Sequence, residues 1–291
     1  MAILSAFRSD IFKIDRLFTT LFLIGPTGCG KSELAQSIRA IFMHPDAPMF
    51  NLHSGPDAAF FTTLERYRDA PVIMEEYNDM QISDAKFQGL KAAVYDGEGK
   101  TKRKDATSKD LDQSQVNAVP IILGQESPER DDASLANRTV IRPVKKVEYW
   151  TEQETEDFQT LKNLEKMGLT NILVDILSQR EIVQKIYPKK LRMVQKEFRD
   201  DLRAEDISFQ TRILNTVSLF AAMVKLIEDE VTDFKLPFTY DEFYPMARQV
   251  LVSQSESIET TNRLAVFFDT LMLLAEDTTA RGIVKDKDYK I

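Results

Sequence analysis

The stretch Gly25-Pro-Thr-Gly-Cys-Gly-Lys31-Ser32 lies between an apolar run, LFTTLFLI at 17–24, and a helical pattern, SELAQSIRAIFM at 32–43. It fits the pattern GxxxxGK[ST], in which a glycine loop opens a helix and aims successive backbone N–H groups at phosphate oxygens. The strand pattern before the loop and the helix pattern after it provide the context that this motif requires. The sequence therefore predicts a phosphate-binding loop for a nucleoside triphosphate.

Each residue type in this loop has a physical role. The glycines let the backbone approach the phosphates, the Lys31 ammonium group should reach the β and γ phosphates, and the Ser32 hydroxyl should ligate Mg²⁺. Cys29 stands at an unconstrained position and is not a candidate nucleophile. ATP and Mg²⁺ are the expected cofactors, and the whole loop is expected to contact the nucleotide: Gly25, Pro26, Thr27, Gly28, Cys29, Gly30, Lys31 and Ser32.

Composition excludes several classes of protein. A single cysteine excludes an internal disulfide, and with only two histidines no zinc cluster is expected, so a metal would be held by oxygen ligands. The net charge of -8 argues against a generally basic DNA-coating protein, but it leaves room for a local basic strip or a basic pore in an oligomer.

Location can also be inferred from the sequence. No apolar run approaches the roughly 20 residues that span a bilayer. The first residues, MAILSAFRSDIFKID, lack the ordered basic, apolar and small-residue regions of an export signal. We therefore expect a cytoplasmic protein without a membrane segment.

The distribution of residues predicts two domains. Eight of the ten glycines precede Trp150, together with short apolar runs at 71–74, 118–123 and 139–141 and helical segments at 57–69 and 82–94. We expect an α/β phosphate-loop ATPase domain at 1–150, with a mainly parallel sheet flanked by helices, and an all-α C-terminal domain at 151–291.

The second half has apolar residues at helical spacing in two places. These residues are expected to form core stripes, because apolar faces on globular helices usually pack together. The first stripe is Ile213, Leu214, Val217, Phe220, Ala221, Val224 and Ile227, and the second is Leu264, Phe267, Phe268 and Leu271. The basic stretch at 189–199 is interpreted as an ordinary helix face.

Two adjacent carboxylates, Glu75 and Glu76, follow the apolar run Val72-Ile73-Met74. Because parallel strands end at one edge of a sheet, the pair should share a crevice with the glycine loop. Glu75 could then support the Mg²⁺ shell while Glu76 polarises the attacking water. The alternative is that both glutamates merely begin a solvated loop.

Polar and basic residues follow the run at 118–123. Gln125 should lie beside the acid pair and could orient the lytic water, although a glutamine opening a surface turn is an equal alternative. Arg138 is a candidate for a residue donated to the γ phosphate of a neighbouring subunit, with Arg130 and Arg142 in reserve. A surface ion pair with Asp131 or Asp132 is the alternative role for such an arginine.

A glycine-containing segment at 96–105 carries four basic residues within five positions. It is expected to be an exposed loop or hairpin that could grip a nucleic-acid backbone, or else a solvated charged turn. These residues are Lys100, Lys102, Arg103 and Lys104.

The order of these features resembles the superfamily 3 helicases and their AAA+ relatives, in particular the helicase parts of phage, plasmid and integrated-element primase-helicases. The resemblance covers about residues 17–145. It is most specific at Glu75-Glu-Tyr-Asn-Asp79, at Phe87-Gln-Gly-Leu-Lys-Ala-Ala-Val-Tyr-Asp-Gly-Glu-Gly99, and from Gly124-Gln-Glu-Ser-Pro128 to Leu135-Ala-Asn-Arg138. The sequence departs from the family where Gln125 replaces the usual asparagine and Glu75 the frequent aspartate.

The resemblance implies a Mg²⁺-dependent ATPase that moves or unwinds DNA during replication of a mobile element. It also implies a hexameric ring whose basic hairpins track single-stranded DNA, and a primase region or protein as a possible partner. An AAA+ loader acting on a protein partner would share every catalytic residue. A small-molecule kinase and a non-hydrolysing interaction module are further alternatives.

Overall fold

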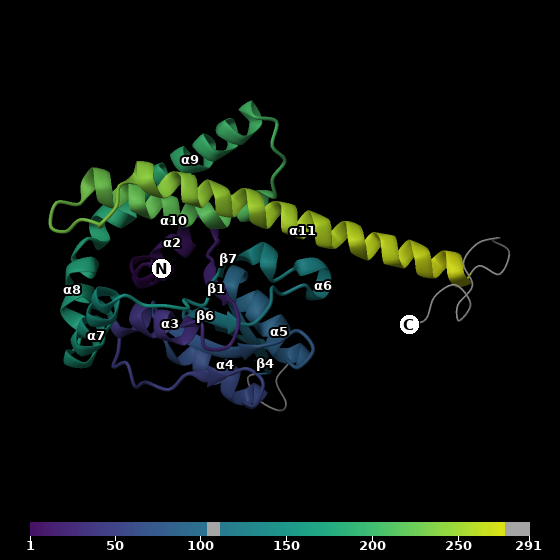
Figure 1. Cartoon of the computed structure of the whole chain (residues 1–291), viewed down its shortest axis with the longest axis horizontal. Helices are drawn as coiled ribbons and strands as arrows, with labels where there is room; N and C mark the ends of the chain where they lie inside the picture. The colour runs from purple at the N-terminus through teal and green to yellow at the C-terminus, as the bar shows by residue number, and fades with distance from the viewer. Residues whose placement is uncertain (104–110, 277–291) are drawn as a thin grey trace.

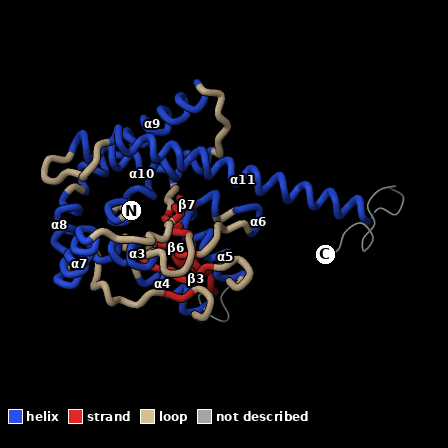
Figure 2. The backbone as a smooth tube through the Cα atoms, viewed as in Figure 1, coloured by secondary structure: helices blue, strands red, loops and turns tan. Residues whose placement is uncertain are grey.

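A computed structural model of the chain describes residues 1–103 and 111–276. Its centre is a sheet of five strands, all parallel, in the order β2-β3-β6-β1-β7 (Figures 1 and 2). The strands are β1 (Thr20–Ile24), β2 (Phe50–Asn51), β3 (Pro71–Tyr77), β6 (Val119–Gly124) and β7 (Thr139–Pro143). The predicted parallel sheet flanked by helices is confirmed.

Helices cover both faces of this sheet, which explains why its inner strands are continuous apolar runs. On one face, Leu23, Ile73 and Ile121 pack against Ala35 of α3 (Lys31–Ala40). The opposite face carries a second cluster, which includes the aromatic residue Phe22 of β1. That face is covered by α4 (Asp57–Arg66), α5 (Asp84–Lys91) and the π-helical turn η1 (Ala92–Asp96).

A separate two-stranded sheet interrupts the chain between β3 and β6. It pairs β4 (Glu98–Arg103) with β5 (Leu111–Gln115) in antiparallel fashion. The predicted loop or hairpin at 96–105 thus contains a strand that begins at Glu98, one residue after Gly97, which has φ +67°.

Helices follow the parallel sheet to the end of the described chain. They are preceded by the short helix α6 (Arg130–Ala133) and the 3₁₀ turn η2 (Ala136–Arg138), which lead into β7. The long helices are α7 (Glu152–Met167), α8 (Thr170–Ser178), α9 (Arg180–Ala204), α10 (Thr211–Glu230) and α11 (Tyr240–Glu276). Among the described helices, we find none with the length and apolar content to cross a membrane.

The N-terminal helices share a core with this later region. Residues of α1 (Ala2–Ala6) and α2 (Arg8–Asp15), such as Leu4 and Ile11, belong to one buried cluster with Phe198 of α9 and Leu219 of α10. The predicted domain boundary near residue 150 falls in the loop between β7 and α7. The division into two domains stays a prediction.

The two predicted apolar stripes differ in outcome. The first is buried in α10, with only Phe220 partly exposed, as expected for a helix packed on both sides. The second was wrongly predicted to be core, because Leu264, Phe267 and Phe268 are 53%, 58% and 56% exposed. They lie on the part of α11 that extends away from the rest of the molecule (Figure 1). Helix α11 has 37 residues and is longer than α10, which has 20. The earlier turns of α11 pack on α10.

One side chain of α11 connects this helix to the edge strand of the sheet. The Gln254 amide nitrogen donates hydrogen bonds to the carbonyl oxygens of Ala136 and Thr139, both at 2.8 Å. Its Oε1 accepts a hydrogen bond from the backbone N–H of Ile141 at 3.0 Å. The helix is thus joined to the free side of β7.

Candidate functional site

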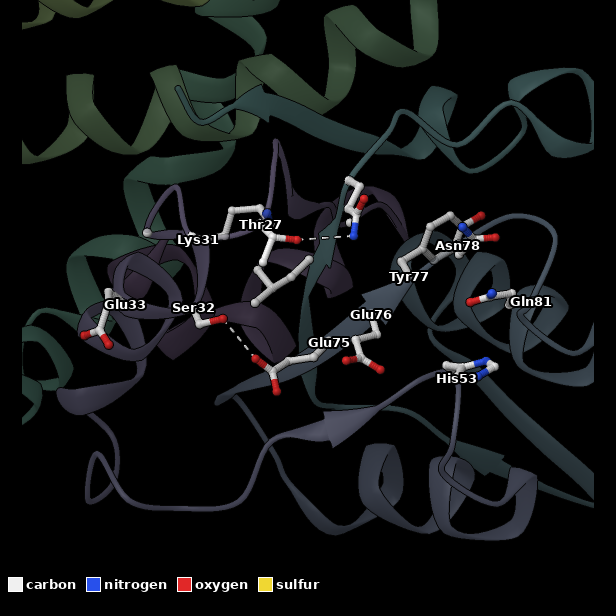
Figure 3. A pocket seen from close by; sticks show the side chains of 15 residues that line it. Thr27, Lys31, Ser32, Glu33, His53, Glu75, Glu76, Tyr77, Asn78 and Gln81 are labelled. Carbon is white, nitrogen blue, oxygen red and sulfur yellow. Dashed lines mark hydrogen bonds between the residues drawn. The ribbon is translucent and has the colours of Figure 1, made fainter. Parts of the chain in front are cut away.

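A cavity of about 820 Å³ opens at the carboxyl ends of β1, β3 and β6. The loop after β1, the first turn of α3 and the last residues of β3 and β6 line it (Figure 3). This is the edge where open parallel sheets bind their ligands. Of the predicted loop residues, Gly25, Pro26 and Cys29 do not line this cavity. The others line it together with the acid pair and Gln125: Thr27, Gly28, Gly30, Lys31 and Ser32.

Left-handed backbone conformations shape the glycine loop. Gly28 and Gly30 have φ of +76° and +92°, and α3 begins directly after Gly30, at Lys31. Gly25 has φ +154°, and a side chain there would collide with the backbone carbonyl oxygen of Val144. The loop therefore needs glycine both for its own turn and for its close approach to the chain after β7.

The side chain of Lys31 folds over its own loop. Its Nζ donates hydrogen bonds to the carbonyl oxygens of Gly25 at 2.6 Å and Pro26 at 2.9 Å, and it lies 3.6 Å from the Sγ atom of Cys29. Cys29 itself is buried. The ammonium group is thus held beside the helix start, where an anion would meet the loop's N–H groups.

The two glutamates lie within β3 rather than after it, because this strand continues to Tyr77. Strict alternation along a strand would point Glu75 and Glu76 to opposite faces of the sheet. A shift in the pairing with β6 between Met74 and Tyr77, with Glu76 at φ +58°, prevents this. Such irregularities redirect side chains, and here both carboxylates line the same cavity (Figure 3).

Each glutamate has a hydrogen-bond donor of its own. The Ser32 hydroxyl donates to Oε1 of Glu75 at 3.0 Å, so a loop oxygen and a strand carboxylate are adjacent. The Asn51 amide nitrogen donates to Oε2 of Glu76 at 2.5 Å. Sequence reasoning missed Asn51, because it ends a strand of two residues that carries no detectable pattern.

Gln125 follows β6, which pairs with β1 on one side and β3 on the other. Its side chain is exposed to the cavity, and Nε2 lies 3.5 Å from the hydroxyl oxygen of Thr27 in the glycine loop. Gln125 thus lines the same cavity as Glu75 and Glu76, and its role in orienting water stays a prediction.

The predicted trans-acting residue, Arg138, does not lie in the cavity of its own chain. It precedes Thr139, which pairs with Thr20, five residues before Gly25, so it sits more than about 16 Å along the strand direction from the glycine loop. Its Nη1 donates to the carbonyl oxygen of Ser134 at 2.6 Å, and its guanidinium group lies 5.6 Å from the ring centre of Tyr95.

The two reserve arginines have contrasting surroundings. Arg130 forms an ion pair with Asp84 and lies 4.8 Å from the ring centre of Phe87. Arg142 lies on β7 opposite Leu23, near the glycine loop, and makes no hydrogen bond or ion pair with the residues that the structure describes.

The predicted nucleic-acid residues that the structure describes lie in the two-stranded sheet, which is separate from the parallel sheet. Lys100, Lys102 and Arg103 belong to strand β4 of the antiparallel pair, and Lys104 lies outside the described residues.

Comparison with solved structures shows a likeness at the level of the fold. No family model matches the chain, and no curated protein matches it by sequence. The structure is similar to a solved one described as "SCCmec type IV Cch - active helicase", with a TM-score of 0.63 and 14% sequence identity. The match covers 97% of this chain and 53% of that one, so the chain spans about half the length of the helicase. At this identity the likeness shows a shared fold alone.

Proposed function

We propose that this chain is a Mg²⁺-dependent ATPase of the phosphate-loop, AAA+-like class. The observation that supports this most directly is the 3.0 Å contact between the Ser32 hydroxyl and Oε1 of Glu75, at the mouth of a glycine loop that opens a helix. Mg²⁺ prefers oxygen ligands and is usually held by one or two protein groups together with substrate phosphates. Ser32 and Glu75 form such a pair.

The remaining residues divide the chemistry of phosphoryl transfer. Lys31 and the N–H groups of the loop bind the β and γ phosphates, and bound Mg²⁺ would neutralise charge that develops on them. Glu76 lies beside Glu75 and accepts the proton of the attacking water. Gln125, which reaches from β6 toward Thr27, orients that water.

The ATPase acts as a helicase-type motor in the replication of a phage, plasmid or mobile element. The antiparallel pair β4–β5 supports this, because it places Lys100, Lys102 and Arg103 on one strand of a sheet that is separate from the parallel sheet. Lysines and arginines of this kind bind the backbone of single-stranded DNA. A hexameric ring would bring six such strands to one pore, and a primase region or protein is its expected partner.

A neighbouring subunit completes each site in this proposal. Arg138 is our candidate, since it lies outside the cavity of its own chain. To act on a neighbour, it must exchange its bond to the Ser134 carbonyl oxygen for the γ phosphate. Arg142, with no such bond among the described residues, is the reserve.

The test is ATP turnover by the wild-type chain and by Glu76→Gln. We expect Glu76→Gln to lower kcat by at least about a hundredfold, because it removes the group that activates water, and to leave ATP affinity nearly unchanged. Ser32→Ala should instead lower Mg²⁺-dependent ATP binding. A wild-type chain that binds no ATP, or a Glu76→Gln variant that still turns over at the wild-type rate, would contradict the proposal.

A further inference from the structure

Helix α9 carries a straight row of basic side chains on its outward face. Their spacing alternates between four and three residues, which keeps them on one side of a helix. All are exposed except Arg199, which is half-buried. The row, called the α9 stripe below, is Lys185, Lys189, Arg192, Lys196, Arg199 and Arg203.

The opposite face of α9 holds the helix in the core. Its buried residues include Val183, Leu191, Val194 and Leu202, and they pack against α10 and the N-terminal helices. Figure 1 shows α9 on the far side of α10 from the sheet. The α9 stripe therefore faces solvent on the outside of the molecule.

Two of the four acids of α9 are turned away from the stripe. Glu197 accepts a hydrogen bond from the Tyr240 hydroxyl at 2.9 Å, and Asp201 binds Arg248 at 2.7 Å, so both acids face α11. One lysine is also turned inward, since Lys190 pairs with Asp229 of α10 at 2.7 Å. These contacts keep Glu197, Asp201 and Lys190 out of the stripe.

Few partners neutralise the stripe. Lys185 and Lys196 contact Glu181 and Asp200 at 3.4 and 3.8 Å, which are weak exposed pairs. The other four members make no hydrogen bond or ion pair with any residue in the described chain. With six basic residues against the two exposed acids Glu181 and Asp200, this face has an excess of positive charge. The region 151–291 as a whole has 19 Lys and Arg against 25 Asp and Glu.

The length and chemistry of the stripe suit a rigid polyanion. It extends about 27 Å, at 1.5 Å per residue over the 18 residues from Lys185 to Arg203. Double-stranded DNA presents one charge per about 1.7 Å of its axis and is straight over this distance. Both aromatic residues of this fully described helix, Tyr187 and Phe198, are buried, so the stripe has no ring on which an unpaired base could stack.

We propose that the α9 stripe binds the phosphate backbone of double-stranded DNA, independently of sequence. It is a second nucleic-acid surface, separate from the β4–β5 strands assigned above to single-stranded DNA. The binding requires no nucleotide, because no residue of the stripe lines the ATP cavity. It therefore does not depend on the proposed hydrolysis.

The test compares two variants of the whole chain that lose the same charge. The stripe variant changes Lys189, Arg192, Lys196 and Arg203 to glutamine. The control changes four exposed basic residues elsewhere, Arg66, Arg68, Lys146 and Lys166, to glutamine. Binding of a labelled duplex of arbitrary sequence is measured by anisotropy without ATP over a series of salt concentrations, and circular dichroism checks that each variant is folded.

We expect the stripe variant to lose at least tenfold in duplex affinity. The slope of log K against log salt should fall by about 0.9 for each phosphate that the variant no longer binds. The control should stay within about threefold of wild type, because exposed charges far from the bound duplex are screened by salt. Equal reductions in the two variants, or an unchanged affinity in the stripe variant, would overturn the proposal.

Two further probes test whether the stripe binds a polyanion other than duplex DNA. If the stripe variant loses affinity for oligo-dT but not for the duplex, the ligand of the stripe is single-stranded DNA, and the proposal is overturned. The proposal is also overturned if the stripe variant loses affinity only for vesicles that contain phosphatidylglycerol. The stripe would then be a membrane-binding surface. Unchanged binding of oligo-dT by the stripe variant would support the separation of the two nucleic-acid surfaces.

Discussion

The Asn51 amide donates a hydrogen bond to Oε2 of Glu76 at 2.5 Å, so the proposed catalytic base is already bound by a donor at the end of β2. A hydrogen bond to a charged acceptor contributes about 1.5–3 kcal/mol. We expect Asn51→Ala to raise the kcat of ATP hydrolysis by about threefold to tenfold, because Glu76 is then free to bind water.

Steady-state ATP hydrolysis with saturating Mg²⁺ measures this effect. The matched control is His53→Ala, which removes another side chain that lines the cavity without a bond to Glu76 among the described residues. A fall in kcat for Asn51→Ala would show that Asn51 positions the base for catalysis instead of restraining it.

Gly25→Ala should impair the glycine loop more than Gly28→Ala. Both residues have positive φ, which costs a residue with a side chain about 1–2 kcal/mol. At Gly25 the new methyl group would also collide with the carbonyl oxygen of Val144. The Val144 N–H donates a hydrogen bond to the carbonyl oxygen of Ile24 at 2.7 Å, so this backbone cannot easily move away. At Gly28 nothing lies within 4 Å.

We expect Gly25→Ala to lower ATP affinity by at least tenfold and to lower Tm, whereas Gly28→Ala should change Tm by a smaller amount. Equilibrium binding of a fluorescent ATP analogue and thermal unfolding measure the two effects. Equal behaviour of the two variants would show that the close approach to Val144 has little effect.

Alanine at Lys100, Lys102, Arg103 and Lys104 should separate DNA binding from hydrolysis. Without these charges the affinity for oligo-dT should fall at least tenfold, and its salt slope by about 0.7 for each phosphate that is no longer bound. Basal ATP hydrolysis should remain, since β4 belongs to a two-stranded sheet separate from the parallel sheet that carries the glycine loop and the acid pair, while stimulation by DNA disappears. Unchanged DNA affinity and stimulation would favour the AAA+ loader that acts on a protein partner.

Arg138→Ala should lower kcat by about a thousandfold if Arg138 completes a neighbour's site. Mixing this variant with Glu76→Gln tests the trans arrangement. Some interfaces of a mixed ring join an intact Glu76 to an intact Arg138, so part of the activity should return. Absence of recovery, or a fall in kcat seen only with Arg142→Ala, would remove Arg138 from this role.

Phenylalanines on α9 and α11 should differ sharply in their effect on stability. Phe198 is fully buried and stacks on Tyr244 with ring centres 4.6 Å apart, so Phe198→Ala should cost about 3–5 kcal/mol of unfolding free energy. Phe267→Ala and Phe268→Ala should each change it by less than about 0.5 kcal/mol, because more than half of each side chain is exposed. Urea unfolding followed by circular dichroism measures both, and a large destabilisation by Phe267→Ala would show that α11 is covered in solution.

The parts of the site that could be predicted are those that the local sequence determines. The glycine loop needs only a strand, a turn and a helix in succession, and the parallel sheet follows from apolar runs that alternate with helices. The common position of Glu75 and Glu76 was also predicted, but for an incomplete reason. Their shared direction depends on the irregular pairing between β3 and β6, which involves residues far apart in the chain.

Other features depend on what surrounds an element. Asn51 could not be recognised, because β2 is held by its pairing with β3 and not by a pattern of its own. The stripe at Leu264 and Phe267 was mistaken for core, because periodicity identifies one face of a helix and does not reveal what covers it. Which charged side chains of α9 face solvent likewise depends on the partners that α10 and α11 provide.

The side-chain amide of Gln254 presents the same donor and acceptor as a peptide group. By bonding to Thr139 and Ile141, it occupies two backbone groups that a sixth strand would use beside β7, and it also bonds to Ala136 in the turn before this strand. An open sheet edge can recruit a strand from another chain, which is a common route to aggregation. We expect Gln254, and the helix that carries it, to hinder the addition of a further strand to this edge of the sheet.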